Sequence, residues 1–239
     1  MALNQAKGNM YQGWVTHTHS HLGGRCPHEC SYCYVDNPRW GRPERYKGEL
    51  RLIEKEFSVN YGSGKSIFIE NMNDLFADEV GSSFIYRILK HCKEYPDNVY
   101  VFQTKNPSRY AYVGRIESDC YLTWPKQFII GCTIESNRNM SKISKSPSTN
   151  ERAYAMRLLS GRKFVTIEPI LQFDLKETID MIVPIKPEFV NIGADSKGNN
   201  LPEPTWFEVM ALIDGLRKAG IEVREKSNLN RLRRNNELS

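Results

Sequence analysis

Short apolar runs alternate with helical patterns along the chain, and this alternation restricts the possible folds more than any other feature of the sequence. Runs rich in Val, Ile and Phe, typical of buried parallel strands, lie at residues 13–16, 66–70, 99–104, 128–134, 164–167, 189–192 and 221–224. Helical patterns lie at residues 48–57, 83–94, 109–113, 151–159, 174–181 and 205–219. Such alternation predicts βαβ crossovers and a parallel sheet. We therefore expect an α/β fold, either a complete or partly open barrel or an open doubly wound sheet.

Polar or small residues follow the C-terminal end of nearly every expected strand. In a parallel α/β barrel these strand ends face one mouth, where catalytic groups gather. Each residue alone is also compatible with an ordinary polar loop, but the whole set predicts a site. The set consists of Glu70, Asn71, Thr104, Lys105, Asn106, Thr133, Glu135, Ser136, Asn137, Glu168, Gly193, Asp195, Glu225 and Lys226.

The composition and charge of the chain indicate a cytoplasmic protein. The 239 residues contain no apolar run near the ~20 residues of a membrane span, and the N-terminus lacks the apolar core of a secretory signal. The net charge of +5, from 33 basic and 28 acidic residues, is compatible with a nucleic-acid partner but does not require one. Part of this charge lies in Arg231, Arg233 and Arg234, so residues 227–239 are expected to form a basic C-terminal tail.

Three of the six cysteines, Cys26, Cys30 and Cys33, lie together in a C-x3-C-x2-C motif just after the first expected strand. A disulfide framework would instead spread paired cysteines through a small secreted chain. Iron–sulfur clusters normally have four Cys ligands, so three neighbouring thiolates can hold a cubane and leave one iron open. An open coordination position is typical of catalytic metal sites.

This motif, with Tyr32 directly before the last cysteine, resembles the signature of the radical S-adenosylmethionine superfamily. The resemblance implies a partial (β/α) barrel of about six parallel strands with flanking helices over residues 1–226, with the cluster loop after the first strand. It also implies a 4Fe-4S cluster that binds S-adenosylmethionine at its open iron and receives an electron from an external donor such as flavodoxin. In that superfamily the electron cleaves the sulfonium and yields a 5′-deoxyadenosyl radical, which abstracts a substrate hydrogen.

The same resemblance implies cofactor contacts at the strand ends. Residues 70–71 occupy the position that contacts the methionine amino group, although the usual Gly-Gly-Glu pattern is absent. Residues 131–136 resemble the ribose-contacting strand, and residues 190–193 resemble the strand that approaches the adenine. Lys105 or Arg138 is the expected partner of the methionine carboxylate. The cofactor-binding candidates are Tyr32, Glu70, Asn71, Thr104, Lys105, Thr133, Glu135, Ser136, Arg138, Asn191 and Gly193.

Residues 71–76, 103–109 and 166–171 resemble one branch of that superfamily. This branch contains small phage-associated proteins and is more distantly similar to spore photoproduct lyase. The resemblance implies hydrogen abstraction from a nucleobase, with modified thymidine in DNA as the leading case, and isomerisation, cleavage or repair as the outcome. A phage-encoded protein would act in the host cytoplasm. A peptide or small metabolite is the alternative substrate.

Three further residues are predicted to be catalytic. Glu168 and Lys226 end two expected strands, so they are expected to face the mouth, where Lys226 would meet a phosphate or carboxylate. His19 is a candidate proton donor near the cluster, with local hydrogen bonding at a polar strand end as the alternative. Cys132 is adjacent to Thr133 in an expected strand, so the two side chains point to opposite faces of the sheet. If Thr133 faces the mouth, Cys132 faces the helices and has a structural role; a role as hydrogen donor is the alternative.

A zinc site is the main alternative to a cluster. His17, His19, His21 and His28 lie close to the three cysteines, and Cys3His is a common zinc ligand set. The chain would then be a nucleic-acid-binding protein. Small zinc modules usually pair two short ligand clusters, however, and the sequence contains no second one.

Overall fold

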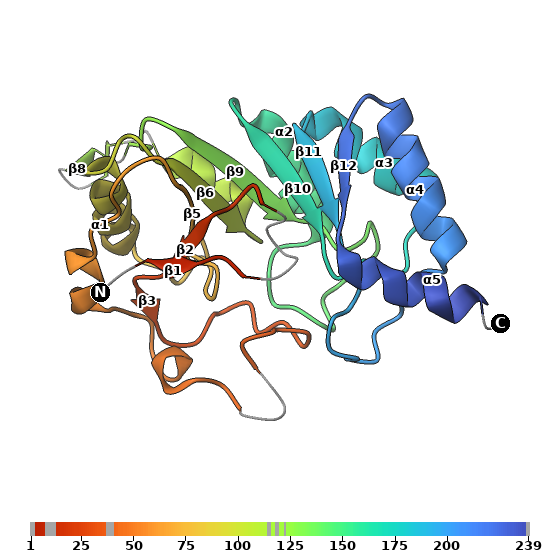
Figure 1. The fold of residues 1–239 in the computed structure, drawn as a ribbon, viewed down its shortest axis with the longest axis horizontal. Helices are drawn as coiled ribbons and strands as arrows, with labels where there is room; N and C mark the ends of the chain where they lie inside the picture. Colours follow the sequence, from red (N-terminus) through yellow and green to blue (C-terminus); the bar gives the residue numbers. More distant parts are fainter. Residues whose placement is uncertain are drawn as a thin grey trace.

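A computed structural model describes residues 3–7, 13–36, 41–113, 116–117, 120–121 and 123–237. Its centre is one eight-stranded sheet in the order β1-β2-β5-β6-β9-β10-β11-β12 (Figure 1). The strands are β1 (Asn4–Gln5), β2 (His17–His19), β5 (Ser66–Ile69), β6 (Val99–Thr104), β9 (Phe128–Thr133), β10 (Lys163–Ile167), β11 (Phe189–Ile192) and β12 (Glu222–Glu225). All neighbours from β2 to β12 are parallel, and β1 pairs antiparallel with β2. Because β1 and β12 are separate edges, the sheet is an open, partial barrel, as expected.

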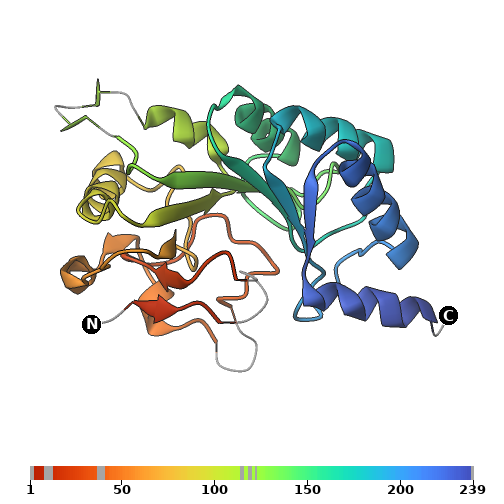
Figure 2. The same ribbon diagram turned by 45° about the horizontal axis from the view of Figure 1, so that its top comes forward.

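The main helices cover one face of this sheet, as Figures 1 and 2 show. They are α1 (Ser82–Lys93), α2 (Thr149–Leu158), α3 (Leu175–Ile182) and α4 (Trp206–Lys218). The spatial order of the parallel strands follows the chain order, so right-handed crossovers all lie on the same side. Capping boxes at Ser148 with Glu151 and at Thr205 with Glu208 determine where α2 and α4 begin.

Shorter elements complete the fold. Two small antiparallel pairs join β3 (Leu22–Gly23) to β4 (Arg51–Leu52) and β7 (Ile116–Glu117) to β8 (Cys120–Tyr121). The 3-10 helices are η1 (Glu44–Tyr46), η2 (Glu54–Ser58), η3 (Pro107–Tyr112), η4 (Val183–Ile185) and η5 (Ser227–Leu229). The segment expected as a basic tail contains η5 and helix α5 (Asn230–Glu237), in which Leu232 is buried. No helix among the described residues is long and apolar enough to cross a membrane.

Three expected elements were wrong in position or type. The first parallel strand is the three-residue β2 at residues 17–19, not 13–16, because its register pairs His17 with Ile67 of β5. The helix expected at 48–57 is instead β4 followed by η2, because the N–H of Ile53 donates to the carbonyl of His21 at 2.8 Å and ties this segment to the loop after β2. The helix expected at 109–113 is a 3-10 helix, η3, which begins two residues earlier and ends at Tyr112.

The two faces of the sheet have different side chains. One face packs into the main core under the helices, where Cys132 is fully buried beside Ile130. The opposite, inner face is apolar toward the N-terminal ends of the strands, where Phe164 and Phe189 stack beside Trp14. Toward the C-terminal ends the inner face becomes polar, with the side chains of Gln103, Thr133, Thr166 and Asn191. The inner face thus has an apolar floor and a polar mouth.

Gly131, in the middle of β9, is required by this close packing. A Cβ placed there would lie 2.1 Å from the ring of Phe164. We expect Gly131→Ala to lower the free energy of unfolding by about 1–3 kcal/mol, roughly 2–12 °C in Tm, because the ring has to move. Thermal and urea unfolding measure this effect. Gly81→Ala is the control, because the nearest atom to its added Cβ is at 3.7 Å. Equal losses in the two variants would contradict the packing argument.

Candidate active site

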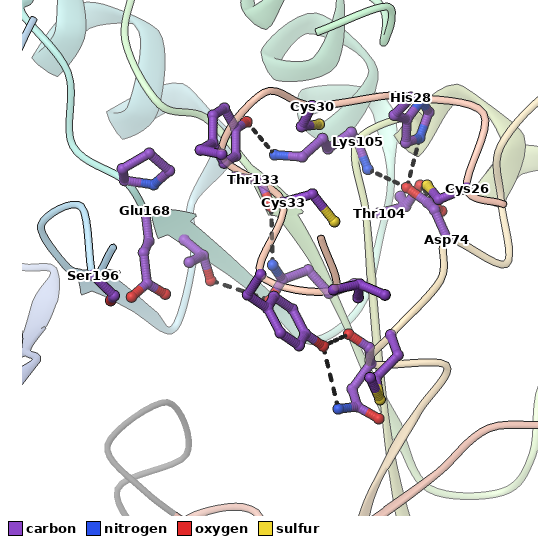
Figure 3. A pocket seen from close by; sticks show the side chains of 18 of the residues that line it. Cys26, His28, Cys30, Cys33, Asp74, Thr104, Lys105, Thr133, Glu168 and Ser196 are labelled. Atoms are coloured by element: carbon purple, nitrogen blue, oxygen red, sulfur yellow. Dashed lines mark hydrogen bonds and ion pairs between the residues drawn. The ribbon is translucent and has the colours of Figure 1, made fainter. Parts of the chain in front are cut away.

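A cavity of about 240 Å3 opens at the C-terminal ends of the strands. Figure 3 shows the three motif cysteines along one side of it and Glu168 with Ser196 on the other. Many residues predicted from the sequence line it together. They are Cys26, Cys30, Tyr32, Cys33, Glu70, Asn71, Thr104, Lys105, Thr133, Glu168, Asn191 and Lys226.

The three thiols belong to a tightly held loop and are all free. Cys30 and Cys33 are joined by a turn in which the N–H of Cys33 donates to the carbonyl of Cys30 at 3.0 Å. Gly24 begins the loop with φ +92°, and a Cβ there would lie 2.1 Å from the carbonyl oxygen of Glu49. Burial, together with the nearby Asp74, raises the pKa of the Cys26 thiol to about 12. A metal that binds this sulfur therefore has to displace a proton.

His28 lies inside the motif and is paired with Asp74. This pair was not predicted from the sequence. His28 Nε2 lies 2.7 Å from one oxygen of Asp74. The same carboxylate accepts hydrogen bonds from the hydroxyl of Thr104 at 2.7 Å and from the backbone N–H groups of Lys105 (2.8 Å) and Phe76 (2.9 Å). Burial opposes ionisation of Asp74, but His28 and these donors hold its pKa below the ordinary value. Asp74 therefore joins the cysteine loop to the ends of β5 and β6.

A buried charge network supports the wall behind Tyr32. Glu135 is fully buried between Lys105 Nζ at 2.5 Å and Arg152 Nη1 at 2.8 Å, and it accepts a hydrogen bond from the hydroxyl of Tyr32. Burial alone would raise the pKa of Glu135, but Lys105 and Arg152 hold it at about 2. Lys105 also donates to the Tyr32 hydroxyl at 2.8 Å. Glu135, predicted as a ribose contact, lies behind the cavity wall and orients these two side chains instead.

Glu70 and Asn71, at the end of β5, form hydrogen bonds with the segment that carries the cysteine motif. Glu70 has φ +59° and accepts hydrogen bonds from the backbone N–H groups of His21 and Leu22, which shapes the loop after β2. The carbonyl of Asn71 accepts a hydrogen bond from the hydroxyl of Tyr34. Both side chains line the cavity, but the carboxylate of Glu70 already has backbone partners.

The opposite wall holds an ion pair between Glu168 and Lys226. Asn228 Nδ2 donates to Glu168 at 3.1 Å, and Lys226 is buried. Gly193 leaves the space for this pair, because a Cβ there would lie 2.7 Å from Glu168 Oε1 and 2.9 Å from Lys226 Cδ. Lys197 Nζ reaches across the mouth to the carbonyl of Tyr34 at 2.6 Å. Gly193 therefore serves this wall, whereas sequence analysis predicted a contact with adenine.

Three further predicted residues lie away from the cavity. His19 packs edge-on against His21 and Tyr61, and burial with the neighbouring His21 lowers its pKa to about 3. Ser136 donates to the carbonyl of Gln172 at 2.6 Å. Arg138 pairs with Asp174 at 2.7 Å on the surface, whereas Lys105, the other predicted carboxylate partner, lines the cavity. None of the three lines the cavity wall.

The donor set fits a cluster better than a single zinc ion. Among the described residues, no three His, Cys, Asp or Glu side chains converge as they would around one metal ion. His17, His19 and His21 do not line the cavity, and His28 is bound to Asp74. Three thiols outside any disulfide instead line the cavity, whereas the side chains of Cys92 and Cys132 are in the core. Three sulfurs spaced along a wall suit a body larger than one ion.

The fold is a partial α/β barrel similar to that of spore photoproduct lyase. Two solved mutants of that protein are each 9% identical to the chain, with TM-scores of 0.60 and 0.61. The matches cover 94% and 92% of this chain, and 80% and 79% of those chains. A double mutant with bound AdoMet and dinucleoside spore photoproduct is 11% identical, with a TM-score of 0.53 over 91% of this chain and 66% of that one.

The chain belongs to the family DUF5131, proteins of unknown function, whose model matches residues 13–217. A comparison with curated proteins gives no match.

Proposed function

We propose that the chain is a radical S-adenosylmethionine enzyme. The observation that carries this proposal is the placement of three free thiols of one C-x3-C-x2-C motif on the wall of a cavity at the C-terminal strand ends. Cys26, Cys30 and Cys33 would hold a 4Fe-4S cluster. When bound, the cluster would supply the electron that cleaves S-adenosylmethionine to methionine and a 5′-deoxyadenosyl radical. Such chemistry needs an external one-electron donor, for which flavodoxin is our proposal.

The chain itself would bind and orient S-adenosylmethionine and exclude water. Lys105, only 15% exposed and paired with Glu135, is the cation that we propose for the methionine carboxylate. Thr133, Thr166 and Asn191 offer hydroxyl and amide groups to the ribose along the polar part of the inner face. Below them lies the apolar floor of the cavity, which limits hydration and so protects a reactive intermediate. Tyr32, fixed by Lys105 and Glu135, offers its ring to the adenine.

We propose a nucleobase as the substrate, with modified thymidine in DNA as the first candidate and isomerisation, cleavage or repair as the outcome. The likeness in fold to a protein solved with a dinucleoside spore photoproduct supports this choice. Glu168 and Lys226 on the wall opposite the cysteines would then face the substrate, where Lys226 suits a phosphate or a carboxylate. A cytoplasmic, phage-encoded enzyme remains part of this proposal. A peptide or small metabolite is the alternative substrate.

Anaerobic reconstitution tests the reaction class. We expect the protein to bind iron and sulfide, and to release 5′-deoxyadenosine from S-adenosylmethionine when a one-electron reductant is added. The yield should rise with the correct modified nucleoside or DNA. Steep loss of DNA binding with added salt would favour a polymeric substrate. Reconstituted protein without iron and sulfide would refute the proposal, and stimulation only by peptides would refute the nucleobase substrate.

A further inference from the structure

A chain of hydrogen bonds connects Cys30 to a buried arginine. Cys30 Sγ lies 3.2 Å from Ser144 Oγ, and Ser144 Oγ lies 2.7 Å from Ser146 Oγ. Ser146 Oγ in turn accepts a hydrogen bond from Arg152 Nη2 at 2.5 Å. Ser144 is 6% exposed and Arg152 is 1% exposed. The chain of contacts therefore runs from the cavity wall, through the half-buried Ser146, to helix α2.

The donors in this chain have a defined direction. A guanidinium can only donate, so Ser146 Oγ accepts from Arg152 and its own hydrogen is left to donate to Ser144 Oγ. Ser144 Oγ also accepts from the N–H of Ser146 at 3.3 Å, so its remaining hydrogen must point elsewhere. The two acceptors within reach are Cys30 Sγ at 3.2 Å and the carbonyl of His28 at 3.4 Å. A thiolate accepts a hydrogen bond more strongly than a neutral carbonyl does, because it is charged.

Arg152 is held in place from the other side. Its Nη1 pairs with Glu135 at 2.8 Å and donates to the carbonyl of Thr133 at 3.0 Å, and its Nε donates to the carbonyl of Pro147 at 2.7 Å. The loop that carries Ser144 is also fixed to the cysteine motif by backbone bonds from Ser31 to Ile143 (2.9 Å) and from Lys145 to His28 (2.8 Å). The serine hydroxyl is thus positioned before any ligand binds.

We propose that Ser144 donates a hydrogen bond to the Cys30 thiolate and thereby makes the cluster easier to reduce. This inference rests on the proposed function. Reduction adds one electron from a one-electron donor and neither forms nor breaks a covalent bond, so the extra charge is spread over the cluster and its sulfurs. A donor to a ligating sulfur stabilises that charge and raises the reduction potential. Ser144 is accordingly a positioning residue that acts through Cys30, with Ser146 and Arg152 setting the direction of its hydroxyl.

The experiment is an anaerobic redox titration of the reconstituted protein, followed by electron paramagnetic resonance. We expect Ser144→Ala to make the one-electron reduction about tenfold less favourable, a shift of about 59 mV to more negative potential. Ser144→Thr, which keeps the hydroxyl, should stay close to the wild type. Ser141→Ala is the matched control, because Ser141 is an exposed serine of the same loop. Electron–nuclear double resonance in D2O should show an exchangeable proton near the cluster that is lost in Ser144→Ala.

The outcomes separate this inference from the proposed function. Wild-type protein that binds no iron and sulfide would refute the proposed function. A loaded Ser144→Ala variant with an unchanged potential would overturn the role of Ser144 and leave the cluster intact. If Ser144→Ala does not fold, Ser146→Ala tests the same chain of hydrogen bonds. Without the hydroxyl of Ser146, Ser144 loses the donor that orients it, so the reduction potential should shift in the same direction. An unchanged potential in Ser146→Ala would then overturn the inference.

Discussion

Replacement of Cys26, Cys30 and Cys33 together by alanine is expected to remove bound iron and sulfide and to reduce 5′-deoxyadenosine formation to background. Cys92 and Cys132 are not expected to substitute, because their side chains lie in the core. The fold should survive, since the three side chains are only partly buried and line a cavity rather than fill the core. Metal and sulfide analysis, product chromatography and circular dichroism measure the three parts of this expectation.

Cys132→Ala is the control for the triple variant. Its thiol is fully buried on the helix-facing side of β9, and burial raises its pKa to about 12. We expect the variant to keep its iron and sulfide and to release 5′-deoxyadenosine normally. A triple variant that still carries the cluster would show that the motif is not its ligand set. Loss of turnover in Cys132→Ala with the cluster retained would instead favour the alternative role of Cys132 as a hydrogen donor.

Glu135→Gln is expected to cost about 3–5 kcal/mol of folding free energy, because it leaves Arg152 and Lys105 without their counter-charge. The amide keeps the shape of the carboxylate, so the loss is chiefly electrostatic. Urea unfolding at neutral pH measures it. Asp180→Asn is the control, since its ion pair with Lys176 is exposed and should contribute at most about 1 kcal/mol. A Glu135→Gln variant as stable as this control would contradict the network.

The same variant has a predictable dependence on pH. The pKa of Glu135 is lowered from 4.5 to about 2, so the ionised carboxylate stabilises the folded state fully above pH 4.5. This contribution is lost as the pH falls from 4.5 toward 2. The difference in unfolding free energy between wild type and Glu135→Gln should therefore be constant near neutrality and shrink below pH 4.5. A difference that does not change with acid would exclude Glu135 as its source.

Local patterns in the sequence were sufficient for the central strands, the main helices and the cysteine motif. Strands β5, β6, β9, β10 and β11 are mostly apolar runs, and the caps of α2 and α4 are short-range signals, so both could be predicted without knowledge of contacts. Strand β2, with the sequence His-Thr-His, carries no such pattern, and its position was missed. Residues 48–57 were wrongly predicted as a helix because their apolar residues have helical spacing. Their structure is decided instead by pairing with the loop after β2. His19, predicted near the cluster, instead packs beside His21 and against Tyr61.

The supporting residues of the site could not be predicted, because their roles depend on distant partners. Asp74 lies in residues 71–76, which were noted only because they resemble one branch of the superfamily. Nothing in the local sequence indicated that Asp74 would pair with His28. Arg152 lies in an ordinary helical pattern, and a buried arginine has no sequence signature apart from its partner Glu135. The position of Glu168 and Lys226 at strand ends predicted that they face the mouth, and both line the cavity. The same pattern does not show that the side chain of Glu135 lies behind the cavity wall, because that depends on its distant partners.

The long separation between Cys30 and Ser144, 114 positions along the chain, has a consequence for biosynthesis. The cysteine motif leaves the ribosome early, while the backbone partners that fix it, around residues 143–145, are synthesised much later. Domains form as units during translation, so the early motif lacks these contacts until strand β9 and the following loop have joined the sheet. If the motif holds the proposed cluster, its insertion into a nascent chain should therefore lag behind emergence of the cysteines themselves.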